Sequence, residues 1–228
     1  MSRDERCDIN SQDDIQKTSN HWLWLYMSLD HTIATSAKWL NECNARLDGA
    51  AIDASDRSRV SAGLLHLSLE HHGAIQFLIS NKPHPHYGSA CALLRPQFDG
   101  FIRGVWFHHC ASEQELNNFI KNCEPPRIDQ LILTIETVPG HEEGLLKTTK
   151  QNVWKLMCSY THGGYIQVAS RNSATEIVCN YSEEQISELV SAACSITLLV
   201  AVAFAKLLNN ETMANEILSE YRKLFSQP

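Results

Sequence analysis

Three charged side chains stand four residues apart in an otherwise apolar segment of this chain. They are Arg95, Asp99 and Arg103, within the segment from Leu93 to Trp106. On an α-helix such residues lie on successive turns and form one charged line. A charge in apolar surroundings is costly without a partner. Two guanidiniums oriented by Asp99 therefore favour an anion or phosphate site, and the alternative is a structural ladder in which Asp99 bridges both arginines.

A second candidate group follows a later apolar helix and ends in two glycines. An imidazole titrates near neutral pH, so His162 is suited to general acid–base catalysis beside the arginines. The glycines allow the backbone to approach a ligand closely. The residues that we expect to be catalytic are Arg95, Asp99, Arg103 and His162. The residues that we expect to bind the substrate are Tyr160, Thr161, Gly163 and Gly164. The alternative for His162 is a structural role at a helix C-terminus.

Other histidines are weaker candidates. Arg103 and His108 are five residues apart, so on a regular helix they are rotated by about 140° and do not share a face. Only a helix distortion or a second subunit would bring them together. His66 and Glu70, with His71 beside them, have the spacing to share a metal ion. A bundle metal site normally needs matching ligands on another helix, and the chain has no Glu-x-x-His motif.

For these three residues we therefore expect polar packing inside a bundle, and a metal-carrying bundle is the other hypothesis. We expect no metal ion and no cofactor at the arginine–histidine site. The chain also lacks a phosphate-binding glycine loop, His-Glu-x-x-His and Gly-x-Ser-x-Gly. The common nucleotide-hydrolase, metalloprotease and esterase mechanisms are therefore not indicated.

Composition limits the partners. The 228 residues carry a formal net charge of −7, which argues against an extended nucleic-acid-binding surface but permits a local site for RNA or a nucleotide. The eight cysteines include no Cys-x-x-Cys, and the first twenty residues are polar. We therefore expect reduced thiols, no signal peptide and a cytoplasmic location. The uncharged run from Leu189 to Ala205 is expected to be a buried core helix rather than a membrane span.

Apolar periodicity and capping signals predict an all-α helical bundle. Residues 1–18 are expected to be a flexible tail, and residues 19–228 a single domain. Pro96 is expected to kink its helix or to restart it. Residues 165–168 and 175–179 are expected to be short extended segments, which would make a small irregular or two-stranded insertion near 165–180. The predicted helices cover residues 20–47, 59–79, 89–110, 112–122, 128–136, 145–161, 182–208 and 211–225.

Three segments together resemble a poorly characterised family of bacterial all-α proteins. They are residues 69–75, residues 92–106 with the pattern Arg-Pro-x-Phe-(Asp/Glu)-x-x-x-Arg-Gly-x-Trp, and residues 159–164 with Tyr-Thr-His-Gly-Gly. The layout is also distantly similar to HEPN-like helical proteins and to abortive-infection proteins. In those proteins an arginine-bearing and acid-bearing helix meets a later histidine inside a bundle.

That wider resemblance implies a metal-independent ribonuclease of phage defence or of a toxin–antitoxin system. It also implies a homodimer or a complex with a partner protein. The alternative is a non-enzymatic module that binds a nucleotide, an anion or another protein of a defence complex.

Overall fold

The computed structural model describes residues 28–139, 141 and 144–225. The expected tail, residues 1–18, and the first part of the helix expected from residue 20 lie outside this range. The described residues form nine α-helices and no β-sheet, so the prediction of an all-α bundle is confirmed. The bounds of the helices are α3 Leu29–Leu47, α4 Asp56–Ser80, α5 Tyr87–His109, α6 Glu113–Ile120, α7 Ile128–Ile135, α8 Leu145–Thr161, α9 Tyr165–Ala169, α10 Glu183–Leu207 and α11 Glu211–Phe225.

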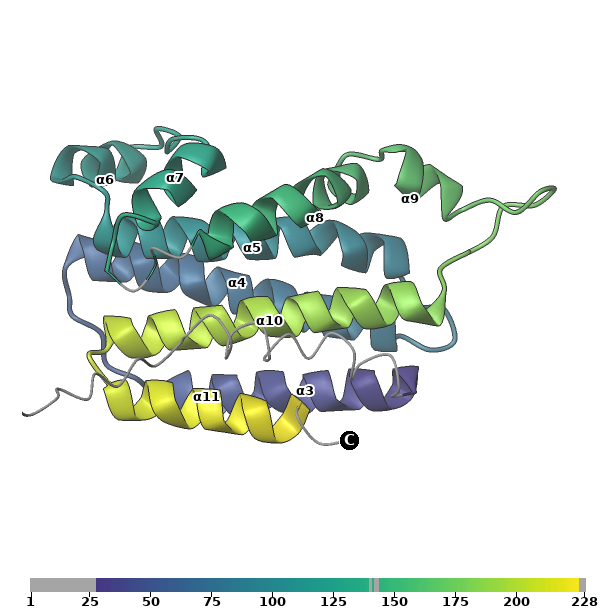
Figure 1. Ribbon diagram of the computed structural model, residues 1–228, viewed down its shortest axis with the longest axis horizontal. Coiled ribbons are helices and arrows are strands. Elements are labelled where there is room, and N and C mark those ends of the chain that lie inside the picture. Colours follow the sequence, from purple (N-terminus) through teal and green to yellow (C-terminus); the bar gives the residue numbers. More distant parts are fainter. Residues whose placement is uncertain (1–27, 140, 142–143, 226–228) are drawn as a thin grey trace, which may run out of the picture.

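The long helices α3, α4, α5, α10 and α11 lie side by side, and α8 lies across α5 (Figure 1). The short helices α6 and α7 lie near the C-terminal end of α5, whereas α9 lies near its N-terminal end. Capping boxes open two of the helices. Ser112 with Glu115 opens α6, and Ser182 with Gln185 opens α10.

Helix α5 runs without a break through Pro96, so the predicted restart does not occur. Two glycines on α5 allow α4 to approach closely. A Cβ atom on Gly104 would lie 2.8 Å from Cγ of Leu65, and one on Gly100 would lie 3.1 Å from the carbonyl oxygen of Leu64. Ser61 donates a 2.8 Å hydrogen bond to the carbonyl of Gly104 across the same seam. Helices α4 and α5 are thus tightly packed against each other.

Helix α10 is the central core helix. It is long and apolar enough to cross a membrane, with a mean hydropathy of 2.1 over its most apolar window, but 61% of that window is buried inside the bundle. Val190, Ala193, Cys194, Val200 and Ala201 are each fully buried against neighbouring helices. Its apolar sequence is therefore explained by burial among other helices, as expected from the sequence.

The segment near 165–180 differs in part from the prediction. Residues 165–169 form the short helix α9 instead of an extended segment, and the second segment contributes an isolated antiparallel bridge between Asn172 and Ile177. The buried amide of Gln167 donates hydrogen bonds to the carbonyls of Gly88 (2.8 Å) and Tyr160 (3.1 Å). These two bonds favour the turn of helix, because they satisfy a side chain that an extended segment would direct elsewhere.

Candidate functional site

Arg95 on α5 and His162 at the end of α8 meet, although 67 residues separate them in the chain. The Nη1–H group of Arg95 donates a hydrogen bond to Nε2 of His162. A guanidinium has no acceptor atom, so Nε2 must offer its lone pair, and in this contact the ring is neutral with its proton on Nδ1. The structure thus brings together the arginine line and the Tyr-Thr-His-Gly-Gly segment.

The guanidinium of Arg95 is held on two further sides. Its Cζ atom lies 4.9 Å from the centre of the Trp154 ring, and its Nε lies 3.9 Å from Oδ2 of Asp99. The Arg95 side chain is 23% exposed, and it lies beside the exposed His162. An arginine fixed in this way is preorganised to bind an anion.

Trp154 and Lys150 belong to this site, and the sequence prediction did not include them. Lys150 Nζ lies 4.9 Å from the Trp154 ring centre and pairs with Asp129 on α7. Two cations therefore contact one indole ring, as the negative face of the ring permits. The signal was present in the sequence, because Lys150 and Trp154 are four residues apart on a helix that contains no Asp or Glu.

Pro96 explains how the end of α8 is attached to α5. A proline has no N–H group, so the carbonyl of Ala92, four residues earlier, loses its helical partner. Thr161 Oγ1 lies 3.2 Å from that carbonyl and 2.9 Å from the carbonyl of Met157, and it shares its proton between them. Thr161 thus positions His162, the next residue, by its hydrogen bond to the carbonyl that Pro96 leaves free.

The two glycines after His162 allow the backbone to turn tightly at the end of α8. His162 is the C-cap of α8, and Gly163 follows with φ of +65°, a left-handed conformation that glycine adopts without strain. Gly164 donates a 2.7 Å hydrogen bond to the carbonyl of Ser159, and a Cβ atom there would lie 3.0 Å from Cα of Ser159. Tyr160 is half-buried against the core, and burial raises its pKa to about 12.

The other two members of the charged line are placed differently. Arg103 pairs at 3.7 Å with Glu124, in the loop between α6 and α7, and its Nε is buried without a hydrogen-bond partner among the described residues. Asp99 Oδ1 is likewise buried without such a partner. Burial raises the pKa of Asp99, although the guanidiniums of Arg95 and Arg103 act in the opposite direction. The guanidinium of Arg103 is thus engaged away from the Arg95–His162 contact.

The remaining histidine candidates lie outside this group. Helix α5 includes both Arg103 and His108, and His108 is half-buried near Arg57, which together with burial lowers its pKa. His66 and Glu70 are exposed on α4, and His71 is half-buried. In the described part of the chain, no three His, Cys, Asp or Glu side chains gather in a way that would hold a metal ion.

The fold and the site define an all-α bundle with an arginine–histidine pair between helices α5 and α8. The model of the family of unknown function DUF6988 matches residues 65–227, and the chain belongs to this family. Residues Arg95 to Trp106 and Tyr160 to Gly164 both lie inside the matched range. No curated protein and no solved structure matches the chain.

Proposed function

We propose that this protein is a cytoplasmic, HEPN-like effector that cleaves RNA without a metal ion at Arg95 and His162. Its context would be phage defence or a toxin–antitoxin system, in which it acts as a homodimer or with a partner protein. The observation that carries the proposal is the contact between the Arg95 guanidinium and Nε2 of His162. It joins an anion-binding group to an imidazole, a side chain that commonly serves as a general base or acid.

The reaction proposed for Arg95 and His162 is an internal transesterification, in which the phosphorus of one phosphodiester is transferred from the 5′-oxygen to the 2′-oxygen. The phosphate takes the Nη1–H of Arg95, which frees Nε2 of His162. His162 then accepts the proton of the ribose 2′-hydroxyl, and the 2′-oxygen attacks the adjacent phosphorus. The bond to the 5′-oxygen of the next nucleotide breaks, and that oxygen takes a proton from water. Arg95 stabilises the charge that develops on the non-bridging oxygens, and the products are a 2′,3′-cyclic phosphate and a 5′-hydroxyl.

Local charge supports an anionic substrate. Residues 145–175 contain Lys147, Lys150, Lys155 and Arg171 but no Asp or Glu, in a chain whose net charge is −7. The side chains of Lys147, Lys155 and Arg171 are exposed. The face of the bundle formed by α8 and the following segment is therefore locally positive. A local patch of this kind favours a short stretch of a phosphate-bearing ligand.

One observation favours the non-enzymatic alternative. Nε2 of His162, the atom that would accept the proton, is engaged by Arg95, and Arg103 is paired with Glu124. A site in this state offers hydrogen-bond donors to an anion but no free base. A module that binds a nucleotide or another anion through Arg95, without cleaving it, uses the same residues.

The test separates binding from cleavage on the full chain. A fluorescent single-stranded RNA is incubated with the wild type, His162→Ala and Arg95→Gln in the presence of EDTA, and both anisotropy and fragment length are measured. His66→Ala and Arg59→Ala are matched controls, because both residues are exposed on α4, away from α8. We expect His162→Ala to cut cleavage by roughly 10²–10⁴-fold while RNA binding persists.

Each other result has a definite meaning. RNA that stays intact but binds in an Arg95-dependent manner supports the binding module and refutes the ribonuclease. Cleavage that is unchanged in His162→Ala, or that EDTA abolishes, also refutes the proposed mechanism. If the protein neither binds nor cleaves the RNA, both proposed functions are refuted. In cells, an active ribonuclease stops growth on expression, and His162→Ala restores it.

A further inference from the structure

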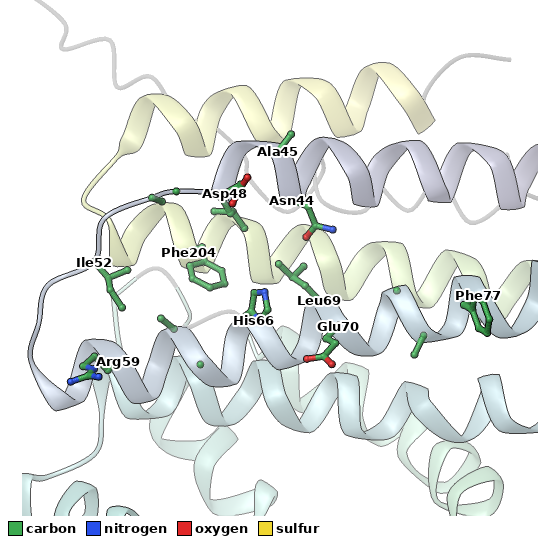
Figure 2. A pocket seen from close by; sticks show the side chains of 17 residues that line it. Asn44, Ala45, Asp48, Ile52, Arg59, His66, Leu69, Glu70, Phe77 and Phe204 are labelled. Atoms are coloured by element: carbon green, nitrogen blue, oxygen red, sulfur yellow. The ribbon is translucent and has the colours of Figure 1, made fainter.

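A groove of about 1060 Å³ lies between α3 and α4 on the part of the molecule away from Arg95 and His162. Figure 2 shows Asn44 of α3 and Asp48, which follows α3, on one wall of the groove. His66 and Glu70 of α4 lie on the other wall, and Phe204 of α10 lies between the two walls. The linker that joins α3 to α4 closes one end of the groove.

One face of α4 lines this groove over much of the helix. The lining extends from Arg59 to Phe77, a span of 18 residue steps and about 27 Å along a helix. Phe77 is 74% exposed, and Ile52 of the linker is 37% exposed. A Cβ atom on Gly63 would meet nothing within 4 Å. The groove is therefore open and largely apolar, and exposed apolar surface of this extent is unusual without a ligand or partner.

The chain carries a segment that fits this groove in chemistry and length. Residues 22–27 are Trp-Leu-Trp-Leu-Tyr-Met, six consecutive large apolar residues just before the described range. Lys82, which follows α4, pairs with Asp30 in the first turn of α3 at 3.2 Å, so α3 begins near the Phe77 end of the groove. Eight extended residues span about 26 Å, close to the length of the lined face.

A side-chain cap marks the start of helix α3. Ser28 is the N-cap of α3, with an extended backbone and a side chain that accepts a hydrogen bond from the backbone N–H of His31. Within the described range, α3 begins at Leu29. The chain before Ser28 is joined to the bundle at the end of the groove where the exposed Phe77 stands.

We propose that residues 20–27 of the same chain occupy the groove between α3 and α4, with Trp22 and Trp24 as its anchors. A buried tryptophan removes roughly 150–250 Å² from water, so two of them cover a large part of the exposed apolar wall. A short tether keeps the segment at a millimolar effective concentration, which favours it over a segment of another molecule. This inference does not depend on the proposed function, because none of the groove's lining residues belongs to the Arg95–His162 site.

The test is hydrogen–deuterium exchange of residues 20–27 in the full chain, read by mass spectrometry. We expect their amides to exchange at least ten-fold more slowly than in a free peptide of the same sequence. Gly63→Trp fills the open space in the groove, and Phe77→Ser removes part of its apolar wall. Both changes should restore fast exchange and shift tryptophan emission to longer wavelength. Leu133→Ser is the matched control, because Leu133 is 56% exposed on α7, away from the groove.

The outcomes distinguish the possible occupants. Fast exchange in the wild type, or protection that survives both groove variants, overturns the proposal. Protection that appears only as protein concentration rises assigns the segment to a second copy and also overturns it. Circular dichroism shows whether each variant is folded. If Gly63→Trp does not fold, Phe77→Ser alone decides, because it replaces a side chain that is mostly exposed.

Discussion

Two of the histidines that have polar partners, His162 and His72, lie in opposite surroundings. His162 is exposed at the end of α8 and accepts a hydrogen bond from Arg95. His72 of α4 is fully buried, with Nε2 3.0 Å from Oγ of Ser36 on α3 and Nδ1 2.7 Å from Oγ1 of Thr197 on α10. The ring of His72 thus links three helices, and burial lowers its pKa to about 3.

The surroundings of His72 form a polar seam inside an apolar core. Gln97 Nε2 donates to the carbonyl of Ala193 at 3.0 Å and contacts Thr197 at 3.3 Å, and Cys194 Sγ lies 3.1 Å from Oγ of Ser36. Hydroxyl, imidazole and amide N–H groups contact one another there, whereas Oε1 of Gln97 is buried without a hydrogen-bond partner among the described residues. Buried polar groups that bind one another mainly specify which helices pair and in which register.

The comparison shows that a hydrogen-bonded histidine is not by itself a functional site. Both rings have partners from distant parts of the chain, but only His162 is exposed to solvent and stands beside a positive charge that a ligand can share. We therefore assign a structural role to His72 and propose a chemical role for His162, and three predictions test this distinction.

The largest effect is expected from His72→Ala. Removing the ring leaves a cavity and takes a partner from both Ser36 and Thr197, so the free energy of unfolding should fall by about 3 kcal/mol. Urea denaturation followed by circular dichroism measures this change. His162→Ala should change stability by less than about 0.5 kcal/mol, because its ring is exposed. Equal losses in the two variants would contradict the assignment.

A pH titration of stability should also separate the two histidines. The pKa of His72 is about 3 in the folded chain and 6.5 in an exposed imidazole, so protonation favours the unfolded chain. Its stabilising contribution is complete above pH 6.5 and declines as the pH falls toward 3. Between pH 6.5 and 5.0 the loss is about 2 kcal/mol.

The check is to compare the wild type with His72→Gln by urea denaturation at several pH values. His109, whose pKa burial lowers to about 4, and Asp99 contribute equally to both proteins. The difference between the two slopes therefore isolates His72. Parallel slopes would show that this ring is already accessible to protons in the folded chain.

The smallest effect is expected from Thr161→Val, which keeps the shape of the side chain but removes its hydroxyl. The carbonyl of Ala92 then loses a partner that Pro96 cannot replace, and we expect a loss of about 1 kcal/mol. Because Thr161 positions His162, the same variant should also weaken RNA binding or cleavage. Thr175→Val, at an exposed position near the isolated bridge, is the control. If RNA binding and cleavage are unchanged in Thr161→Val, Thr161 does not position His162.

The elements of the fold could be predicted because their signals are local. The capping boxes at Ser112 and Ser182 and the apolar periodicity of the long helices specify where helices begin and which faces are buried. Pro96 was correctly placed inside a helix, but the predicted restart does not occur. The carbonyl that Pro96 frees accepts a hydrogen bond from a residue 69 positions away, which local spacing does not reveal. Residues 165–168 were predicted wrongly, because the partner of Gln167 on α5 outweighs local preference.

The sequence by itself determined the helices and the line of charges on α5, since both depend on spacing within a few residues. The tertiary structure alone decided that Arg95 contacts His162 and Trp154. It also decided that Arg103 pairs with Glu124 and that His72 is fully buried. The physical reason is that a side chain's partner, exposure and pKa depend on which helices pack against its own, and that choice is made by contacts distant in the chain.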